Sequence, residues 1–191
     1  AETFFIRPGE EGDYKRLLQD LSAQGFEPDF VIHAWSLTGG GDGSGLEAHD
    51  SLNAHGYQSV VHLGRALSSL GLDGRPLGLA VLSSGLHGVT GDETLAPEKA
   101  PVLGPCRVIP NEYLNIQSRN IDIDAPKPGI PPHPELLDAV IRDVTALRDV
   151  LEGRVDAAGF ADTVAYRGRS RWEQRFAHVP LPAAPEAEKA A

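Results

Sequence analysis

Hydrophobic residues follow two patterns along the chain. Continuous runs are typical of strands buried in a parallel sheet, and positions that recur every three or four residues are typical of amphipathic helices. The runs, with one alternating stretch at 116–123, predict strands over 3–7, 30–37, 77–82 and 116–123, and an extended hairpin or strand over 163–181. The periodic stretches predict helices over 10–24, the second half of 46–70, 97–108 and 133–151.

The clearest helix is the one over 133–151. Its hydrophobic side chains form one stripe, and Gly153 marks its end. A rigid loop, rich in proline, precedes it at 125–134. The helix over 97–108 is less regular, because Pro101 and Pro105 interrupt it after a start that carries Pro97.

Strands that alternate with helices predict an α/β fold with a mostly parallel sheet flanked by helices. We expect one domain over 1–181. Residues 182–191 contain mainly Ala, Pro and Glu, which is typical of a linker-like tail. The chain contains no methionine, as an excised segment of a longer polypeptide could.

Charge and composition exclude several classes of function. The formal net charge is −10, and nucleic-acid binders need a cationic surface, so we expect no nucleic-acid partner. No hydrophobic run approaches the roughly 18 residues of a membrane span, and the first residues lack the pattern of a signal peptide. The single cysteine, Cys106, excludes an internal disulfide and favours a reducing compartment. We therefore expect a cytoplasmic protein with no membrane partner.

A glycine-rich stretch, 38–45, matches T-G-x-x-x-G-x-G, the pattern with which short-chain dehydrogenases hold a dinucleotide pyrophosphate. Five of the seven residues from 39 to 45 are glycine, so the match is weak. The next predicted strand also lacks an acidic residue at its end to bind a ribose hydroxyl. A surface loop is the favoured interpretation, and a cofactor site is the alternative.

Such a dehydrogenase also needs a tyrosine acid with a lysine four residues later, which lowers the pKa of the phenol. The chain has four tyrosines, Tyr14, Tyr57, Tyr113 and Tyr166. The residues four positions after them are Leu18, Val61, Gln117 and Ser170. The sequence therefore lacks the catalytic pair.

Other reactive residue types are better explained as structural. Residues 83–85 read as a strand that ends at a glycine turn, without the G-x-S-x-G motif of a serine hydrolase. His33 reads as a core residue, and no histidine shows metal-ligand spacing. Cys106 has only Arg107 to activate it, and Asp92–Glu93 reads as a solvated turn.

Four arginines recur near the end of the chain and would share one face of a strand: Arg167, Arg169, Arg171 and Arg175. A half-exposed edge strand is the simpler interpretation. A docking face for an acidic partner or a neighbouring domain is the alternative.

Several ordered blocks over residues 3–181 resemble the structural subdomain of the ketoreductase region in modular polyketide synthases. An early strand (FVIHAWSLT, 30–38) and a middle strand and turn (SSGL, 83–86, with VTGDE, 89–93) resemble its first half. The segment PEKA (97–100) with LGPCRVIPNEY (103–113), the strand IDID (121–124) and the closing strand AYRGRSRW (165–172) before Phe176 resemble its second half. The glycines of 39–45 depart from the family and look like an insertion.

This resemblance implies a truncated Rossmann-like fold and carries over no catalytic, cofactor-binding or metal-ligating residue. It implies that NADPH and a Ser-Tyr-Lys set belong to a catalytic ketoreductase subdomain that follows in the same polypeptide. That subdomain and neighbouring synthase domains would be the partners, and the chain alone would not be an enzyme. Two alternatives are a self-sufficient NAD(P)-dependent reductase that uses residues 38–45, and a degenerate ketoreductase half that separates synthase domains.

Overall fold

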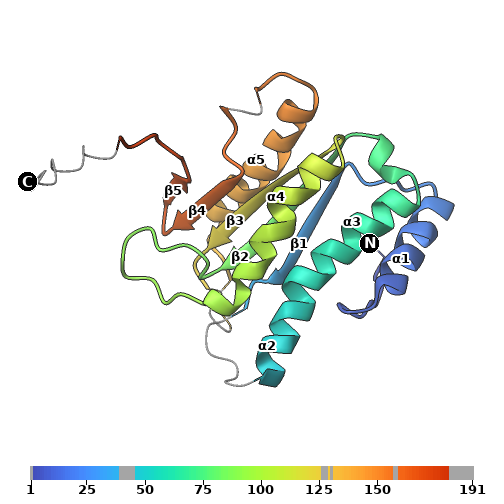
Figure 1. Ribbon diagram of the computed structural model, residues 1–191, viewed down its shortest axis with the longest axis horizontal. Helices are drawn as coiled ribbons and strands as arrows, with labels where there is room; N and C mark the ends of the chain where they lie inside the picture. Colours follow the sequence, from blue (N-terminus) through green and yellow to red (C-terminus); the bar gives the residue numbers. More distant parts are fainter. Residues whose placement is uncertain (1, 39–45, 126–128, 130, 157–158, 181–191) are drawn as a thin grey trace, which may run out of the picture.

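A mixed five-stranded sheet forms the centre of the molecule, as the computed structural model shows for residues 2–38, 46–125, 129, 131–156 and 159–180 (Figure 1). Its strands follow one another across the sheet in chain order. They are β1 (Phe30–Ser36), β2 (Leu77–Ser84), β3 (Ile116–Ile123), β4 (Thr163–Arg167) and β5 (Ser170–Glu173). The first four pair in parallel, and β5 pairs antiparallel to β4. The predicted α/β fold with a mostly parallel sheet is confirmed.

Helices cover both faces of the sheet (Figure 1). One face carries α1 (Glu11–Ala23), α3 (Ser59–Ser69) and α4 (Leu103–Glu112), and the other carries α5 (Pro134–Leu151). The remaining helical segments are α2 (Leu46–Asn53), the π-helix η1 (Ala54–Gln58) and two 3-10 segments, η2 (Leu72–Gly74) and η3 (Pro97–Val102). Alternate residues of β2 serve the two cores, since Leu79 packs under α3 and α4 while Ala80 packs under α5.

The connections β2–α4–β3 and β3–α5–β4 have opposite hands. Both move the chain one strand further in the same direction, but their helices lie on opposite faces of the sheet. Right-handed connections between parallel strands are the rule. One of these two connections is therefore of the rare left-handed kind. Among the described helices, the difference in hand leaves α5 alone on its face of the sheet.

Most predicted elements are confirmed, but the strand at 3–7 is wrong. The described residues of that segment have no partner in the sheet. Ile6 packs against the core, Phe5 is 95% exposed, and Arg7 binds Asp13 of α1. A hydrophobic run alone cannot supply the neighbouring strand that its backbone would need.

Four other elements differ from the prediction in extent or burial. The helix expected over 97–108 begins as the 3-10 segment η3 and continues as α4 to Glu112. The helical region of 46–70 includes its first half, because α2 and η1 run directly into α3. The strand at 30–37 is parallel but lies at the edge of the sheet, which leaves Ile32 51% exposed. The extended segment of 163–181 is a short hairpin that turns at Gly168, where φ is 57°. No described helix is long and apolar enough to cross a membrane.

Candidate functional site

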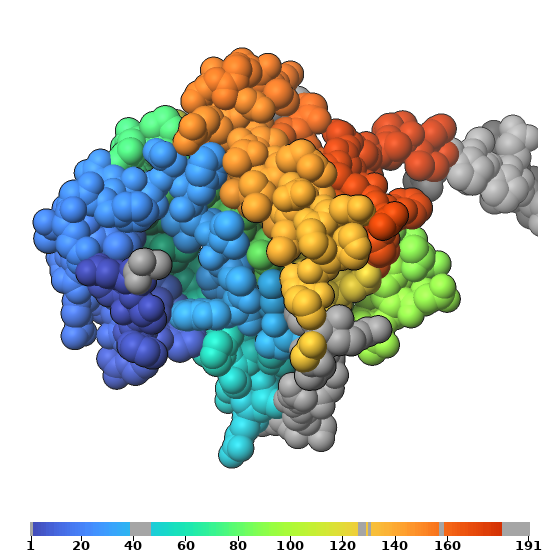
Figure 2. Space-filling view, turned by 180° about the vertical axis from the view of Figure 1, so that it is seen from behind, coloured from blue at the N-terminus to red at the C-terminus, as the bar shows by residue number. Residues whose placement is uncertain are grey.

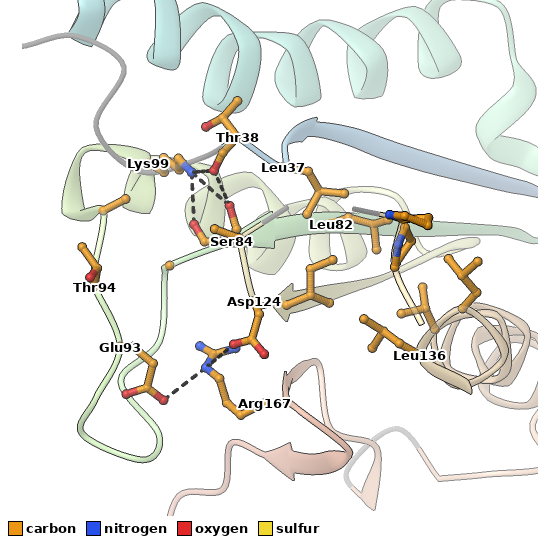
Figure 3. A pocket seen from close by; sticks show the side chains of 18 of the residues that line it. Leu37, Thr38, Leu82, Ser84, Glu93, Thr94, Lys99, Asp124, Leu136 and Arg167 are labelled. Atoms are coloured by element: carbon orange, nitrogen blue, oxygen red, sulfur yellow. Dashed lines mark hydrogen bonds and ion pairs between the residues drawn. The ribbon is translucent and has the colours of Figure 1, made fainter. Parts of the chain in front are cut away.

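A cavity of about 630 Å³ opens where β1, β2 and β3 end, beside the first turns of α5 (Figure 3). Ligands of α/β proteins bind at the carboxyl ends of parallel strands, so this is the expected place for a site. One side of the cavity is polar, with Thr38, Ser84, Lys99 and Arg167. The other side is apolar and includes Leu82, Ile123, Leu136, Leu137 and Val140.

Lys99 of η3 connects the ends of β1 and β2. Its Nζ donates to the backbone oxygens of Thr38, at 3.0 Å, and Ser84, at 3.1 Å, and to Ser84 Oγ at 3.1 Å (Figure 3). The residue is only 6% exposed, and this burial lowers the pKa of the ammonium group. Lys99 therefore gives the polar side of the cavity a buried positive charge.

Asp122 of β3 organises the loop that follows β2. Its carboxylate is fully buried and accepts hydrogen bonds from Ser83 Oγ at 2.9 Å, from the backbone N–H groups of Leu86 and His87, and from Arg167 at 2.7 Å. All four donors come from the protein itself. The buried charge is thus satisfied internally, as a structural carboxylate requires.

Glu93 closes the same loop from the other side. Its carboxylate accepts from the backbone N–H groups of Thr90, Val89 and Gly91 and from Arg167 Nε at 3.1 Å. Above all the hydrogen bond from the Thr90 backbone holds the pKa of Glu93 well below its usual range. The prediction of a solvated turn at Asp92–Glu93 is therefore wrong for Glu93, whose side chain is 9% exposed.

A second ionic cluster lies on the α5 face of the sheet. The carboxylate of Asp143 accepts from Arg119 at 2.8 Å, from the Tyr166 hydroxyl at 2.5 Å and from Arg171 at 2.8 Å. The Arg119 guanidinium also stacks on Phe160, 3.6 Å from the ring centroid. Burial lowers the pKa of Arg119 to about 10 and raises that of Tyr166 to about 12. The cluster fastens α5 to β3, β4 and β5.

The favoured interpretation of an exposed edge strand holds for β5, which lies at the edge of the sheet, whereas these clusters argue against the alternative of one docking face. Arg167 ends β4 and Arg171 belongs to β5, and both bind acidic residues of the chain itself. Arg169 is 79% exposed by its side chain and pairs with Glu135, and Arg175 pairs with Glu173. The acidic partners of Arg167 and Arg171 are therefore residues of this chain.

The other sequence candidates lie apart from the cavity or have structural roles. The glycine-rich residues 39–45 lie outside the described residues. Residues 83–85 form the predicted strand end, where Gly85 turns with a φ of 74°. Burial raises the pKa of Cys106 to about 12, which removes its nucleophilic thiolate. His33 is 7% exposed and binds Ser59. Within the described residues, no group of His, Cys, Asp and Glu could hold a metal ion.

No tyrosine stands among the described residues that line the cavity. The Tyr14 hydroxyl donates to the Pro8 carbonyl on the face of the sheet that carries α1, and the Tyr166 hydroxyl donates to Asp143. Tyr57 lies in η1, and Tyr113 follows α4 and packs against the core. None of the four tyrosines is therefore among the residues that line this cavity.

Sequence reasoning missed the roles of three charged residues: Lys99 and Glu93, which line the cavity, and Asp122, which lies buried beside it. Asp122 had a signal, because it is a charged residue inside a strand that is otherwise largely buried. Lys99 had none, since it lies in the irregular first turns of the helix predicted over 97–108, and Glu93 was interpreted as part of a solvated turn. Their roles depend on contacts with Ser84 and Arg167 that only the fold creates.

Comparison with protein families gives one partial match. The family model described as beta-ketoacyl synthase-like, N-terminal, matches residues 1–77, which is less than half of the chain. No curated protein matches the sequence.

Solved structures resemble the chain over most of its length. The adenylation, ketoreductase and pseudo Asub multidomain structure of a keto acid-selecting NRPS module matches with a TM-score of 0.66 and 20% identity, over 87% of this chain and 12% of that one. The first ketoreductase of the tylosin PKS matches with a TM-score of 0.55 and 19% identity, over 88% of this chain and 30% of that one. A short-chain dehydrogenase from Mycobacterium avium matches with a TM-score of 0.59 and 14% identity, over 92% and 65%.

The chain thus spans only a fraction of each ketoreductase-containing chain that it matches. At these identities the similarity is one of fold. It confirms, at that level, the resemblance to ketoreductases of modular synthases, and the chain has the Rossmann-like fold of short-chain dehydrogenases.

Proposed function

We propose that this chain is the non-catalytic structural half of a polyketide synthase ketoreductase, and that it packs against and stabilises an NADPH-dependent catalytic half. The observation that carries the proposal is which residue types line the cavity at the strand ends. In a fold shared with short-chain dehydrogenases, the described residues that line it include no tyrosine, and no tyrosine of the sequence precedes a lysine at the required spacing.

The charged residues around the cavity support a structural role. Asp122 and Glu93 both bind Arg167 and the backbone of the loop after β2, so their charges already have partners within the chain. A catalytic group must instead be free to exchange a proton with substrate. These residues connect β3 and β4 to the loop after β2, which is a structural role.

Exposed apolar side chains offer a place for the catalytic half. Val108 of α4 is 52% exposed, and Phe176 is 83% exposed beside Arg107, 5.9 Å from its guanidinium carbon. The segment after β5 runs outward from the body of the molecule (Figures 1 and 2). We therefore expect Phe176 and the neighbouring surface of α4 to contact the catalytic half.

The first experiment measures NADPH binding by fluorescence and the reduction of a β-keto thioester, with this chain alone. We expect neither binding nor turnover. Micromolar binding or measurable turnover would contradict the proposal and favour a self-sufficient reductase; Gly43→Val would then test the glycine-rich loop.

The second experiment adds a separately expressed catalytic half of a polyketide synthase ketoreductase. We expect the two chains to copurify and the melting temperature of the catalytic half to rise. Phe176→Asp should weaken that effect, whereas Phe26→Asp, a matched change of a 57% exposed phenylalanine after α1, should not. Failure to associate would instead favour a spacer between synthase domains.

A further inference from the structure

The ammonium group of Lys99 is a buried charge without an acidic partner. Its three hydrogen bonds all go to neutral oxygens, those of Thr38 and Ser84. Across the described residues, no carboxylate lies within the 4.0 Å of an ion pair from its Nζ. Glu98 and Asp122 act on it only from a greater distance. Buried charges are normally paired, because removing an ion from water is costly.

The wall opposite Lys99 is apolar and suits a hydrocarbon chain. Leu82 and Ile123 of the sheet and Leu136, Leu137 and Val140 of α5 line it. In Figure 3, Lys99 and Ser84 lie at one end of the cavity and Leu82 and Leu136 at the other. Leu137 is 48% exposed although it borders the cavity. A ligand with one polar end and one apolar end would match both walls.

The remaining charges limit how many negative charges a ligand can carry. Three acidic residues also line the cavity, Asp92, Glu93 and Asp124. The second cation, Arg167, is already bound to Glu93 and Asp122. A phosphate-rich ligand such as a dinucleotide would be repelled, because among the described lining residues only Lys99 is a cation free of carboxylates. A single negative charge fits.

We propose that the cavity binds a medium-chain monocarboxylate, with its carboxylate at Lys99 and its alkyl chain along the α5 wall. The volume of about 630 Å³ lies within the usual size of small-molecule sites. On binding, Lys99 exchanges one neutral acceptor, Ser84 Oγ, for a charged one. Such charge-assisted hydrogen bonds are shorter and stronger than neutral ones. This proposal does not depend on the role of the chain in a ketoreductase.

Isothermal titration of the unmodified chain with four probes tests the proposal. The probes are octanoate, 1-octanol, octylamine and inorganic phosphate. We expect saturable binding of octanoate, at least tenfold tighter than that of 1-octanol, and no binding of octylamine or phosphate. No saturable binding of octanoate, or binding of phosphate as tight as that of octanoate, would overturn the proposal. This experiment uses the unmodified chain, so its result does not depend on whether a variant folds.

Two variants then assign the ends of the ligand. Lys99→Gln should weaken octanoate binding at least tenfold and leave 1-octanol unchanged, whereas Leu137→Gln should weaken both. Equal octanoate binding by Lys99→Gln and the unmodified chain would overturn the assignment of the carboxylate. Since Lys99 also connects two strand ends, far-UV circular dichroism is recorded for Lys99→Gln. If that variant does not fold, the decision rests on the four probes and on Leu137→Gln.

Discussion

Arg167, the last residue of β4, donates from Nη2 to Oδ2 of Asp122 in β3 at 2.7 Å, and Asp122 is fully buried. The same guanidinium donates to Glu93 and to the carbonyl of His87. One side chain therefore connects the end of the parallel sheet to the loop after β2. Burial of the carboxylate makes this pair sensitive to the loss of either partner.

Asp122→Ala should lower the free energy of unfolding by about 3 kcal/mol or more, because it leaves the mostly buried Arg167 without its nearest anion and removes the acceptor of two backbone N–H groups. Urea unfolding at neutral pH measures the change. Asp124→Ala is the matched control. Asp124 is 3.9 Å from the same guanidinium but 61% exposed, so we expect a loss of no more than about 1 kcal/mol. If Asp122→Ala lowered the free energy of unfolding by no more than Asp124→Ala does, the Asp122–Arg167 pair would contribute little to stability.

The elements that could be predicted from the sequence are those whose hydrophobic pattern reflects burial of one face of a helix or of both faces of a strand. The helix at 133–151 and the strands at 77–82 and 116–123 are close to α5, β2 and β3, because their hydrophobic positions are the ones that pack. The strand at 3–7 failed since pairing depends on a distant neighbour. Periodicity also missed α2, whose sequence, LEAHDSLN, is largely polar.

The site could not be predicted because it consists of long-range contacts. Lys99 meets Thr38, which is 61 positions away, and Arg167 meets Glu93, which is 74 positions away. The residue types alone were ambiguous. The sequence left open an external basic face that includes Arg167 and Arg171, but in the fold these two residues lie on either side of the turn at Gly168 and each binds a different internal carboxylate. The absence of the tyrosine–lysine pair needed only the sequence.

Gly78→Ala should destabilise the protein by about 1–3 kcal/mol, the usual effect of overpacking a core. A Cβ at this position of β2 would lie 2.5 Å from the Phe30 ring and 3.2 Å from Leu147 Cβ of α5. Thermal and urea unfolding measure the effect. Gly12→Ala in α1 is the control, since a Cβ there meets nothing within 4 Å and should stabilise the helix by up to about 1 kcal/mol. If Gly78→Ala left the free energy of unfolding unchanged, α5 and Phe30 would pack less closely on β2 than the structure shows.

Cys106 should not react with a thiol reagent in the folded protein at pH 8. It is 5% exposed, and burial raises the pKa of the thiol to about 12, so almost no thiolate is present or accessible. Labelling with a chromogenic disulfide measures this, and labelling in denaturant provides the control. Rapid labelling of the folded chain would contradict the described packing of α4 on β3.

His33 should make the stability fall as the solution is acidified from pH 7 to pH 5. Burial, followed by the nearby His55, holds the pKa of His33 at about 4, below its ordinary value of 6.5. Its Nδ1 is buried without a partner, and Nε2 donates to Ser59 Oγ, whose own hydrogen goes to the His55 carbonyl. A proton on Nδ1 would therefore add a buried charge, which desolvation disfavours.

The sign follows from the number of protons bound in each state. Between pH 6.5 and pH 4 the unfolded chain protonates this histidine and the folded chain does not, so the contribution of His33 is present above pH 6.5 and is lost as the pH falls. From pH 7 to pH 5 the loss is about 2 kcal/mol. His33→Gln keeps a donor for Ser59 without titrating, and urea unfolding of this variant at both pH values should show a loss smaller by that amount. Identical losses in the two proteins would assign the acid sensitivity to another group.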